Sequence, residues 1–306
     1  MDEQQGLAAR FEAQRSRLRA VAYRMLGSPT EAEDAVQETW LRLARTDDAR
    51  VDNLPAWLTT VVSRVCLDML RARTARREEL TGQELPERAP DAADGSDPEH
   101  EAFLADAVGR ALLVVLDTLA PAERVAFVLH DLFAVPFDRI APIVERTPVT
   151  TKKLASRARH KVRGTPAVPA AELTRQRRVV EAFLAAARGG DLGELLAVLA
   201  PDVVRRADPA ALRAGGTAEL RGARAVAEET VLLARNARFA APALVDGTVG
   251  LVVAPHGRLL FALTVTTGDG RVTAYDVIAD PARLRGLDLA VLDGRPAARP
   301  PGRTAA

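Results

Sequence analysis

The feature that most constrains the fold is a change in the spacing of apolar residues along this chain of 306 residues. Over residues 7–77, and again over 102–162, apolar side chains recur every three or four positions, which predicts amphipathic helices. Two more helices are expected after Glu172. Beyond Arg235 the pattern becomes alternating or short apolar runs between Asp-Gly, His-Gly and Gly-Asp-Gly turns, which predicts strands. We therefore expect a multidomain protein with two all-α helical domains, followed by an α+β domain in which a curved sheet wraps around helices.

The segment between the two helical regions has a different composition. Residues 78–101 hold nine acidic residues and three prolines against one arginine, which is typical of a flexible linker. The expected domain boundaries are a helical domain at 7–77, an acidic linker at 78–101, a second helical domain at 102–164, an α+β domain at 172–287 and a disordered tail at 288–306.

Charge and cysteine content narrow the class of protein. The formal net charge is only +1, so affinity for nucleic acid would have to come from local basic patches. The single cysteine, Cys66, excludes an internal disulfide framework and a cysteine-rich zinc site, and its apolar surroundings predict a buried side chain. Neither a signal peptide nor an apolar run of about eighteen residues is found, so we expect a cytoplasmic protein with no membrane partner.

Residues 137–164 are typical of two short helices around a tight turn, with a cationic outer face on the second helix. The chain's only three lysines all lie on this second helix. A basic surface helix can simply be solvated, but a preceding helix and turn are the arrangement that places a recognition helix in the major groove of DNA. The residues expected to contact DNA are Thr150, Thr151, Lys152, Lys153, Ser156, Arg157, His160 and Lys161.

Near the N-terminus, Ser28-Pro29-Thr30-Glu31 has the pattern of a capping box with proline at the first helical position, which predicts a helix start. The helix that follows has an apolar face and a second face that holds mostly polar residues. On periodicity alone this second face is an ordinary solvated surface. The residues on it are Glu33, Asp34, Gln37, Glu38 and Leu41.

A third cluster of polar residues spans the loop at 46–54 and the helix after it. Short polar side chains in the loop are able to hydrogen-bond the edges of an unstacked base. Arginines beyond the apolar part of the helix are typical either of a solvated helix end or of a helix that lies along a phosphate backbone. The candidate DNA-binding residues of this cluster are Asp47, Asp48, Arg50, Asn53, Arg64, Arg71 and Arg73.

The C-terminal region also admits an enzyme hypothesis, because open α+β cones can hold small ligands and acid/base carboxylates. The candidates are Asp208, Asp246, His256 and Asp276, but their spacing specifies no catalytic pair, and turn chemistry and surface charge explain them as well. The chain contains no glycine-rich phosphate loop and no zinc-binding or serine-hydrolase motif, so no cofactor, metal site or catalytic residue is expected.

Taken together, these segments resemble the sigma factors of the extracytoplasmic-function type. EAEDAVQETW at 31–40 and PAWL through LDMLR at 55–71 are similar to conserved region two, and LAPAER at 119–124 with SRAR at 156–159 is similar to region four. RTPVTTKKLASRARHKVRG at 146–164, with the residual LPE at 85–87, resembles the sigma-J-type subgroup, which carries a C-terminal SnoaL-like domain. The resemblance covers residues 7–287.

This resemblance implies a non-enzymatic subunit that binds core RNA polymerase and directs it to promoter DNA. Glu33, Asp34, Gln37, Glu38 and Leu41 would contact the beta-prime clamp helices, and the beta flap would be a further contact on the polymerase. The loop cluster would bind the minus-10 element, and residues 150–161 the minus-35 element. The C-terminal domain would modulate activity or dock onto the other two domains. Arg64 stands where many members have asparagine, so the family's exact base preference is not carried over to this chain. The alternatives are a SnoaL or ketosteroid-isomerase-type enzyme and a ligand-sensing DNA-binding regulator that acts without polymerase.

Overall fold

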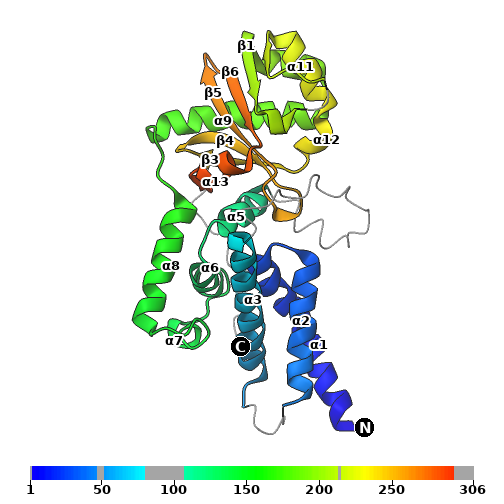
Figure 1. The fold of residues 1–306 in the computed structure, drawn as a ribbon, viewed down its shortest axis with the longest axis vertical. Coiled ribbons are helices and arrows are strands. Elements are labelled where there is room, and N and C mark those ends of the chain that lie inside the picture. The colour runs from blue at the N-terminus through cyan, green and yellow to red at the C-terminus, as the bar shows by residue number, and fades with distance from the viewer. Residues whose placement is uncertain (1, 47–51, 80–106, 213–214, 293–306) are drawn as a thin grey trace, which may run out of the picture. The chain divides into compact units, whose positions relative to one another are not determined.

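The computed structural model describes residues 2–46, 52–79, 107–212 and 215–292, and the predicted fold class is confirmed, with helices followed by a helix and mixed-sheet domain (Figure 1). The helices are α1 (Asp2–Leu26), α2 (Pro29–Ala44), α3 (Leu54–Glu79), α5 (Ala107–Asp117), α6 (Pro121–Phe127), a π-helical turn η3 (Val128–Leu132), α7 (Phe137–Ile140), α8 (Pro148–Arg163), α9 (Ala170–Gly189), α10 (Leu192–Val198), α11 (Ala223–Leu232), α12 (Ala234–Ala237) and α13 (Pro281–Gly286). The strands are β1 (Leu199–Ala207), β2 (Glu219–Arg221), β3 (Ala240–Val245), β4 (Thr248–Val253), β5 (Phe261–Gly268), β6 (Arg271–Ile278) and β7 (Leu289–Ala290). Most of the expected acidic linker lies outside the described residues.

The predicted start of the second helix is confirmed. The hydroxyl oxygen of Ser28 accepts a hydrogen bond from the backbone N–H of Glu31 at 3.4 Å, and Pro29 occupies the first helical position. Gly27 ends α1 with a φ of +75°, and its N–H donates to the carbonyl of Tyr23 at 2.8 Å. A few local residues therefore set the break between α1 and α2.

The described chain divides into two compact units. Of the described residues, the first unit contains 2–46, 52–79 and 116–159, and the second contains 107–115, 160–212 and 215–292. The division passes through α5 and through the last turn of α8, so it does not follow the domain boundaries expected from the sequence, which remain a prediction. Within the first unit α1, α2 and α3 pack together, α6 packs on α3, and η3 packs on α1.

The helix-turn-helix segment forms around a small apolar core. Ile140, Ile143 and Val144 are fully buried, and Ala155 and Ala158 of α8 are buried as well. The first helix, α7, has only four residues, and the chain then turns through Glu145, whose φ is +56°. The spacing of these apolar residues thus leaves the opposite side of α8 exposed.

The C-terminal domain contains a seven-stranded sheet in the order β2-β1-β6-β5-β4-β3-β7, in which β1 and β6 are parallel and the other pairs antiparallel. The turns Asp246-Gly247 and Asp269-Gly270 have positive φ at both residues, as two-residue hairpin turns require. Helices α9, α10 and α11 contribute to an apolar core against one face of the sheet, with Phe183, Leu195 and Tyr275 among its buried members.

The start of the expected C-terminal tail is corrected by β7. Residues 288–306 were expected to be disordered, but Leu289 and Ala290 pair with Val245 and Leu244 of β3. The side chain of Asp246 also accepts the N–H of Asp288 at 2.8 Å. Pairing with a strand more than forty residues earlier leaves no local signal in the sequence, and residues 293–306 lie outside the described chain. No helix in the described parts of the chain is long and apolar enough to cross a bilayer.

Candidate nucleic-acid interface

The outer side of α8 carries a cationic stripe, defined here as Lys152, Lys153, Ser156, Arg157, His160 and Lys161. All six residues are exposed. The first turn of α8 holds no acidic residue, so the partial positive charge of the helix N-terminus adds to that of the lysines. A helix with this charge is suited to contact an anionic polymer.

The start of α8 is capped by a pair of threonines. The backbone N–H of Thr150 donates to the hydroxyl of Thr147 at 3.2 Å, and the two hydroxyls are 3.0 Å apart. The expectation that Thr151 faces outward is wrong, because its side chain is fully buried and donates to the carbonyl of Thr147 at 2.9 Å. The exposed positions at the start of α8 are therefore Pro148, Val149, Lys152 and Lys153.

The candidate minus-10 residues are only partly described. Asp47, Asp48 and Arg50 lie outside the described residues. Asn53 is exposed and caps α3, since its side-chain oxygen accepts the N–H of Ala56 at 3.0 Å.

Two of the candidate arginines on α3 bond to the turn before α8. Arg64 donates to the carbonyl of Pro142 at 3.4 Å, and Arg71 forms an ion pair with Glu145 at 3.2 Å. Both arginines are exposed, so these contacts are weak and easily exchanged. Two of the side chains predicted to bind DNA, Arg64 and Arg71, are thus engaged with the turn before α8 in this structure.

Arg73 differs from the other arginines of this cluster. Its side chain is only 25% exposed, donates to the carbonyl of Leu26 at 3.0 Å and pairs with Glu31. Asp117 lies 4.0 Å away as a second carboxylate. The sequence suggested a DNA contact for Arg73, whereas these bonds connect α3 to the α1–α2 junction and identify it as a structural residue.

A pocket of about 360 Å³ lies where the start of α3 faces the segment before α8. It is lined by Arg17, Asn53, Pro55, Ala56, Thr59, Thr60, Phe133, Ala134, Val135, Pro136, Arg139 and Ile143. Asn53, which belongs to the predicted minus-10 surface, therefore lines this pocket together with Arg139 and Ile143 of the helix-turn-helix segment.

The candidate clamp surface lies on the solvent side of α2. Asp34 and Gln37 are exposed, Glu33 pairs with Arg15, and Glu38 forms an ion pair with Arg42 at 2.9 Å. Leu41 is 42% exposed beside these polar residues. Helix α2 therefore presents a mainly acidic face with an apolar end.

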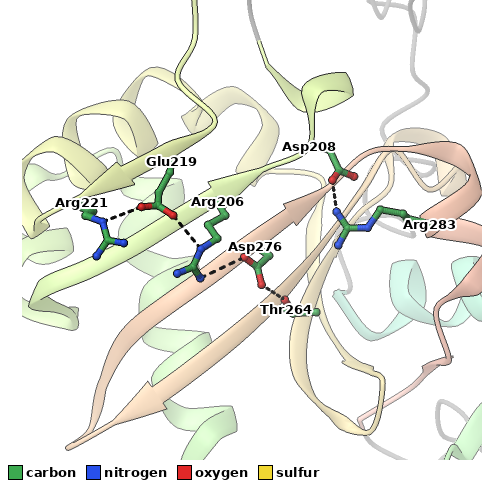
Figure 2. A network of polar contacts seen from close by, with 7 residues as sticks. All are labelled: Arg206, Asp208, Glu219, Arg221, Thr264, Asp276 and Arg283. Carbon is green, nitrogen blue, oxygen red and sulfur yellow. Dashed lines mark hydrogen bonds and ion pairs between the residues drawn. The ribbon is translucent and has the colours of Figure 1, made fainter.

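In the C-terminal domain two carboxylates of the enzyme hypothesis, Asp208 and Asp276, are engaged in structural contacts (Figure 2). Asp276 lies opposite Arg206 on the neighbouring strand and accepts a hydrogen bond from Thr264 at 3.3 Å. Arg206 also pairs with Glu219 at 3.1 Å, so a row of polar side chains crosses four strands. The side chain of Asp246 accepts the N–H of Asp288, as described above, and the side chain of His256 lies outside the described residues.

Asp208 is buried and holds the segment after β6. Its carboxylate accepts the N–H groups of Ala279 and Asp280 at 3.1 and 3.0 Å and pairs with Arg283. Burial by itself would raise the pKa of Asp208, but the two amides and Arg283 outweigh it and hold the pKa below its ordinary value. A carboxylate that stays ionised and fully bonded is suited to a structural role.

Sequence reasoning missed a buried ionic group inside this domain. Arg205 is 2% exposed and makes a two-point contact with Glu229, while a third N–H donates to the carbonyl of Thr217. Next to it, burial raises the pKa of Tyr275 to about 12, and the phenol lies 3.3 Å from the hydroxyl of Thr230. The alternation of β1 places Arg205 inward, but its partners come from distant segments.

Among the described residues no group of three or more metal-binding side chains occurs.

The last turn of α8 is bonded to the C-terminal domain. The N–H of Val291 donates to the carbonyl of Val162 at 2.9 Å, and that of Ala167 donates to the carbonyl of Gly247 at 2.8 Å. Gly164, at a φ of +61°, lies so close to Ala290 that a Cβ added to it would be 2.3 Å from the Cβ of Ala290. The end of the candidate recognition helix and the sheet are therefore packed as one piece.

Comparisons with known proteins identify relatives of this chain. Residues 11–76 match the family model for Sigma-70 region 2. The chain is 38% identical over 307 residues to the ECF RNA polymerase sigma factor SigJ of Mycobacterium tuberculosis (strain ATCC 25618 / H37Rv), with 94% of this chain and 96% of the relative covered. It is 36% identical over 208 residues to the probable ECF RNA polymerase sigma factor SigI of M. tuberculosis (strain CDC 1551 / Oshkosh), with 68% and 72% covered.

A solved structure is also similar. The crystal structure of the M. tuberculosis extracytoplasmic function sigma factor SigJ has 36% identity and a TM-score of 0.45, with 91% of this chain and 98% of that chain covered. At the sequence level the alignment with SigJ covers 94% of this chain. The chain therefore belongs to the extracytoplasmic-function family of RNA polymerase sigma factors.

Proposed function

We propose that this protein binds core RNA polymerase and directs it to promoters, with α8 contacting the minus-35 element and the start of α3 contacting the minus-10 element. The observation that carries this proposal is the cationic stripe on the exposed side of α8. The chain has a net charge of only +1, so this local stripe supplies the attraction to phosphates. A recognition helix that follows a turn is the element that enters the major groove.

The acidic face of α2 is proposed to contact the clamp helices of the beta-prime subunit. Asp34 and Gln37 are free of the bundle core, and Leu41 adds an exposed apolar group beside them. An apolar side chain at the edge of a polar patch is typical of a protein interface. We expect Asp34→Arg to abolish co-purification with core polymerase. Asp202→Arg, at an exposed acidic position of β1, serves as the matched control and leaves co-purification intact.

Run-off transcription with core polymerase tests the DNA-binding part of the proposal. Lys153→Ala or Arg157→Ala should each weaken promoter binding by about 1 to 3 kcal/mol. Both residues are exposed, so the fold should be unchanged. Arg175→Ala removes an equally exposed arginine from α9 and should leave promoter binding at the wild-type level. If both α8 variants bind like the wild type, the exposed side of α8 is not the DNA-binding surface.

The C-terminal domain is proposed to modulate promoter use through the last turn of α8. Support comes from the hydrogen bond of Val291 to Val162 and from the close contact of Gly164 with Ala290. Val291→Pro removes the backbone N–H that donates to the carbonyl of Val162, whereas Val291→Ala keeps this N–H. We expect only the proline variant to change the affinity for promoter DNA, and equal affinities would argue against this coupling.

The protein is proposed to act in the cytoplasm and without catalytic chemistry of its own. Unstacking of bases at the minus-10 element costs a few kcal/mol per base and is offset by contacts in the base pocket and by stacking of about 1 to 3 kcal/mol. The acidic linker at 78–101 would allow the two DNA-binding regions to reach separate elements. This role fits the sigma factor relatives, and the carboxylates of the enzyme hypothesis have structural partners instead.

A further inference from the structure

The first turn of α8 exposes an apolar side chain that the proposed function does not use. Among the described residues three large apolar side chains are exposed, namely Leu41 at 42%, Val149 at 67% and Leu232 at 69%. Leu41 belongs to the α2 surface, and Leu232 ends α11 in the C-terminal domain. Val149 is the one that adjoins the cationic stripe, since it lies one helical turn before Lys152 and Lys153.

We propose that Val149 contacts the C5-methyl group of a thymine in the minus-35 element and thereby makes the protein prefer thymine at that position. This inference rests on the proposed function of α8. Residues at the N-terminal end of a recognition helix are those that meet base edges in the major groove. Val149 is the second residue of α8 and is therefore in the right part of the helix.

The chemistry of the first turn favours a methyl contact. Thymine is the base that presents a methyl group in the major groove, and apolar side chains are its usual partners. The hydroxyl of Thr150 already interacts with that of Thr147, and the hydroxyl of Thr151 is buried and bonded to the backbone. The methyl groups of Val149, next to the exposed Pro148, are thus apolar groups of this turn that remain open for a contact with a base.

Val149 also has a restricted choice of side-chain conformations. A β-branched side chain in a helix has one strongly preferred rotamer, so both methyl groups point in a defined direction. The backbone beneath it is fixed by Pro148 at the first helical position and by the bond from the N–H of Thr150 to Thr147 at 3.2 Å. Such a rigid apolar contact loses little conformational freedom on binding.

The fold does not require valine at this position. Valine has a lower helix propensity than alanine, and an exposed valine gains little from burial. Val149→Ala should therefore leave the stability of α8 unchanged or slightly higher. The variant isolates the effect of the methyl groups on DNA recognition.

The test uses DNA in which single thymines are replaced by deoxyuridine, which removes the methyl group alone. Duplexes are first selected from a random library by the full-length protein together with core polymerase. Each thymine of the upstream element is then replaced in turn, and affinity is measured by competition in fluorescence anisotropy. Wild-type protein should bind the thymine form about fourfold more tightly than the uracil form at one position, the effect of burying one methyl group. Val149→Ala should show a ratio near one there.

The matched control is Leu232→Ala, which removes the other strongly exposed apolar side chain and should keep the fourfold ratio. Three outcomes would overturn the inference while promoter binding stands. The wild type could bind the thymine and uracil forms equally at every position, or Val149→Ala could keep the wild-type ratio of the two affinities. The third outcome is a selected upstream element that contains no thymine. If no duplex is selected, the proposed function itself fails and the inference fails with it.

Discussion

The contact between the end of α8 and β7 can be tested by the substitution Gly164→Ala. Gly164 has a φ of +61°, and its N–H donates to the carbonyl of His160 at 2.9 Å. A Cβ at this position would lie 2.3 Å from the Cβ of Ala290 and 3.5 Å from a methyl carbon of Leu244. The substitution therefore adds a strained backbone conformation and a steric clash at the same point.

The expected cost follows from these two terms. A left-handed conformation costs a non-glycine residue about 1 to 2 kcal/mol, and overpacking costs about 1 to 3 kcal/mol, so the local free energy of opening should fall by roughly 2 to 5 kcal/mol. Gly270→Ala is a matched control, because its φ is +74° and no atom lies within 4 Å of the added Cβ. It should show the backbone cost alone. Gly286→Ala, with neither feature, should be near neutral.

Hydrogen exchange followed by mass spectrometry measures the free energy of opening for the segment that contains β7. The N–H of Val291 is the direct reporter, since it donates to the carbonyl of Val162. Both tryptophans, Trp40 and Trp57, lie in the first unit, so their fluorescence shows that this unit stays folded. If Gly164→Ala lowers the free energy of opening no more than Gly270→Ala does, the close contact with Ala290 does not exist and the reasoning fails.

Three further predictions concern charge and burial. Because the pKa of Asp208 is lowered in the folded protein, its carboxylate stabilises the fold above the unfolded pKa of about 3.9, and this contribution is lost as the pH falls through the folded pKa. Asp208→Asn should thus lower the free energy of unfolding in urea by on the order of 2 kcal/mol at pH 7 and by progressively less in acid. A difference in free energy of unfolding between wild type and variant that does not depend on pH would contradict this role of Asp208. Cys66 is fully buried, and burial raises the pKa of its thiol to about 12. Iodoacetamide at pH 8 should therefore label Cys66 only after the protein unfolds. Rapid labelling of the native protein would refute the burial of this residue. Arg71→Glu should break the ion pair with Glu145, and adding Glu145→Arg should restore an ion pair in the double variant. A double-mutant cycle should then give a coupling energy of about 0.2 to 1 kcal/mol. Additive effects on stability would show that the pair contributes nothing.

The local features of the fold were predictable because their signals span only a few residues. Ser28 and Pro29 begin α2 through a side-chain cap and a fixed φ, both of which can be seen in the sequence. The Asp-Gly turns at 246–247 and 269–270 follow from the positive φ that such turns need. Helical spacing likewise identified the lysines of α8 as an exposed stripe.

The candidate site was predicted less completely, because some residues with the expected chemistry have other partners. Thr151 lies next to the exposed positions of α8, yet it is fully buried and its hydroxyl donates to the carbonyl of Thr147. Arg73 belongs to a run of arginines that looked uniform, but Glu31 and the carbonyl of Leu26 come from other elements and hold it. Periodicity describes one helix at a time and contains no information on which neighbour covers a given side.

The amino-acid sequence by itself determined the order of helices and strands, the turns between them and the place of the cationic helix, since each depends on interactions within a few residues. Only the tertiary structure decided that β7 pairs with β3, that Val291 bonds to the end of α8, and that Arg64 and Arg71 bond to the turn before α8. These contacts join residues that are far apart along the chain. They form because folding brings backbone donors, acceptors and opposite charges within reach of one another, and no short sequence pattern encodes that proximity.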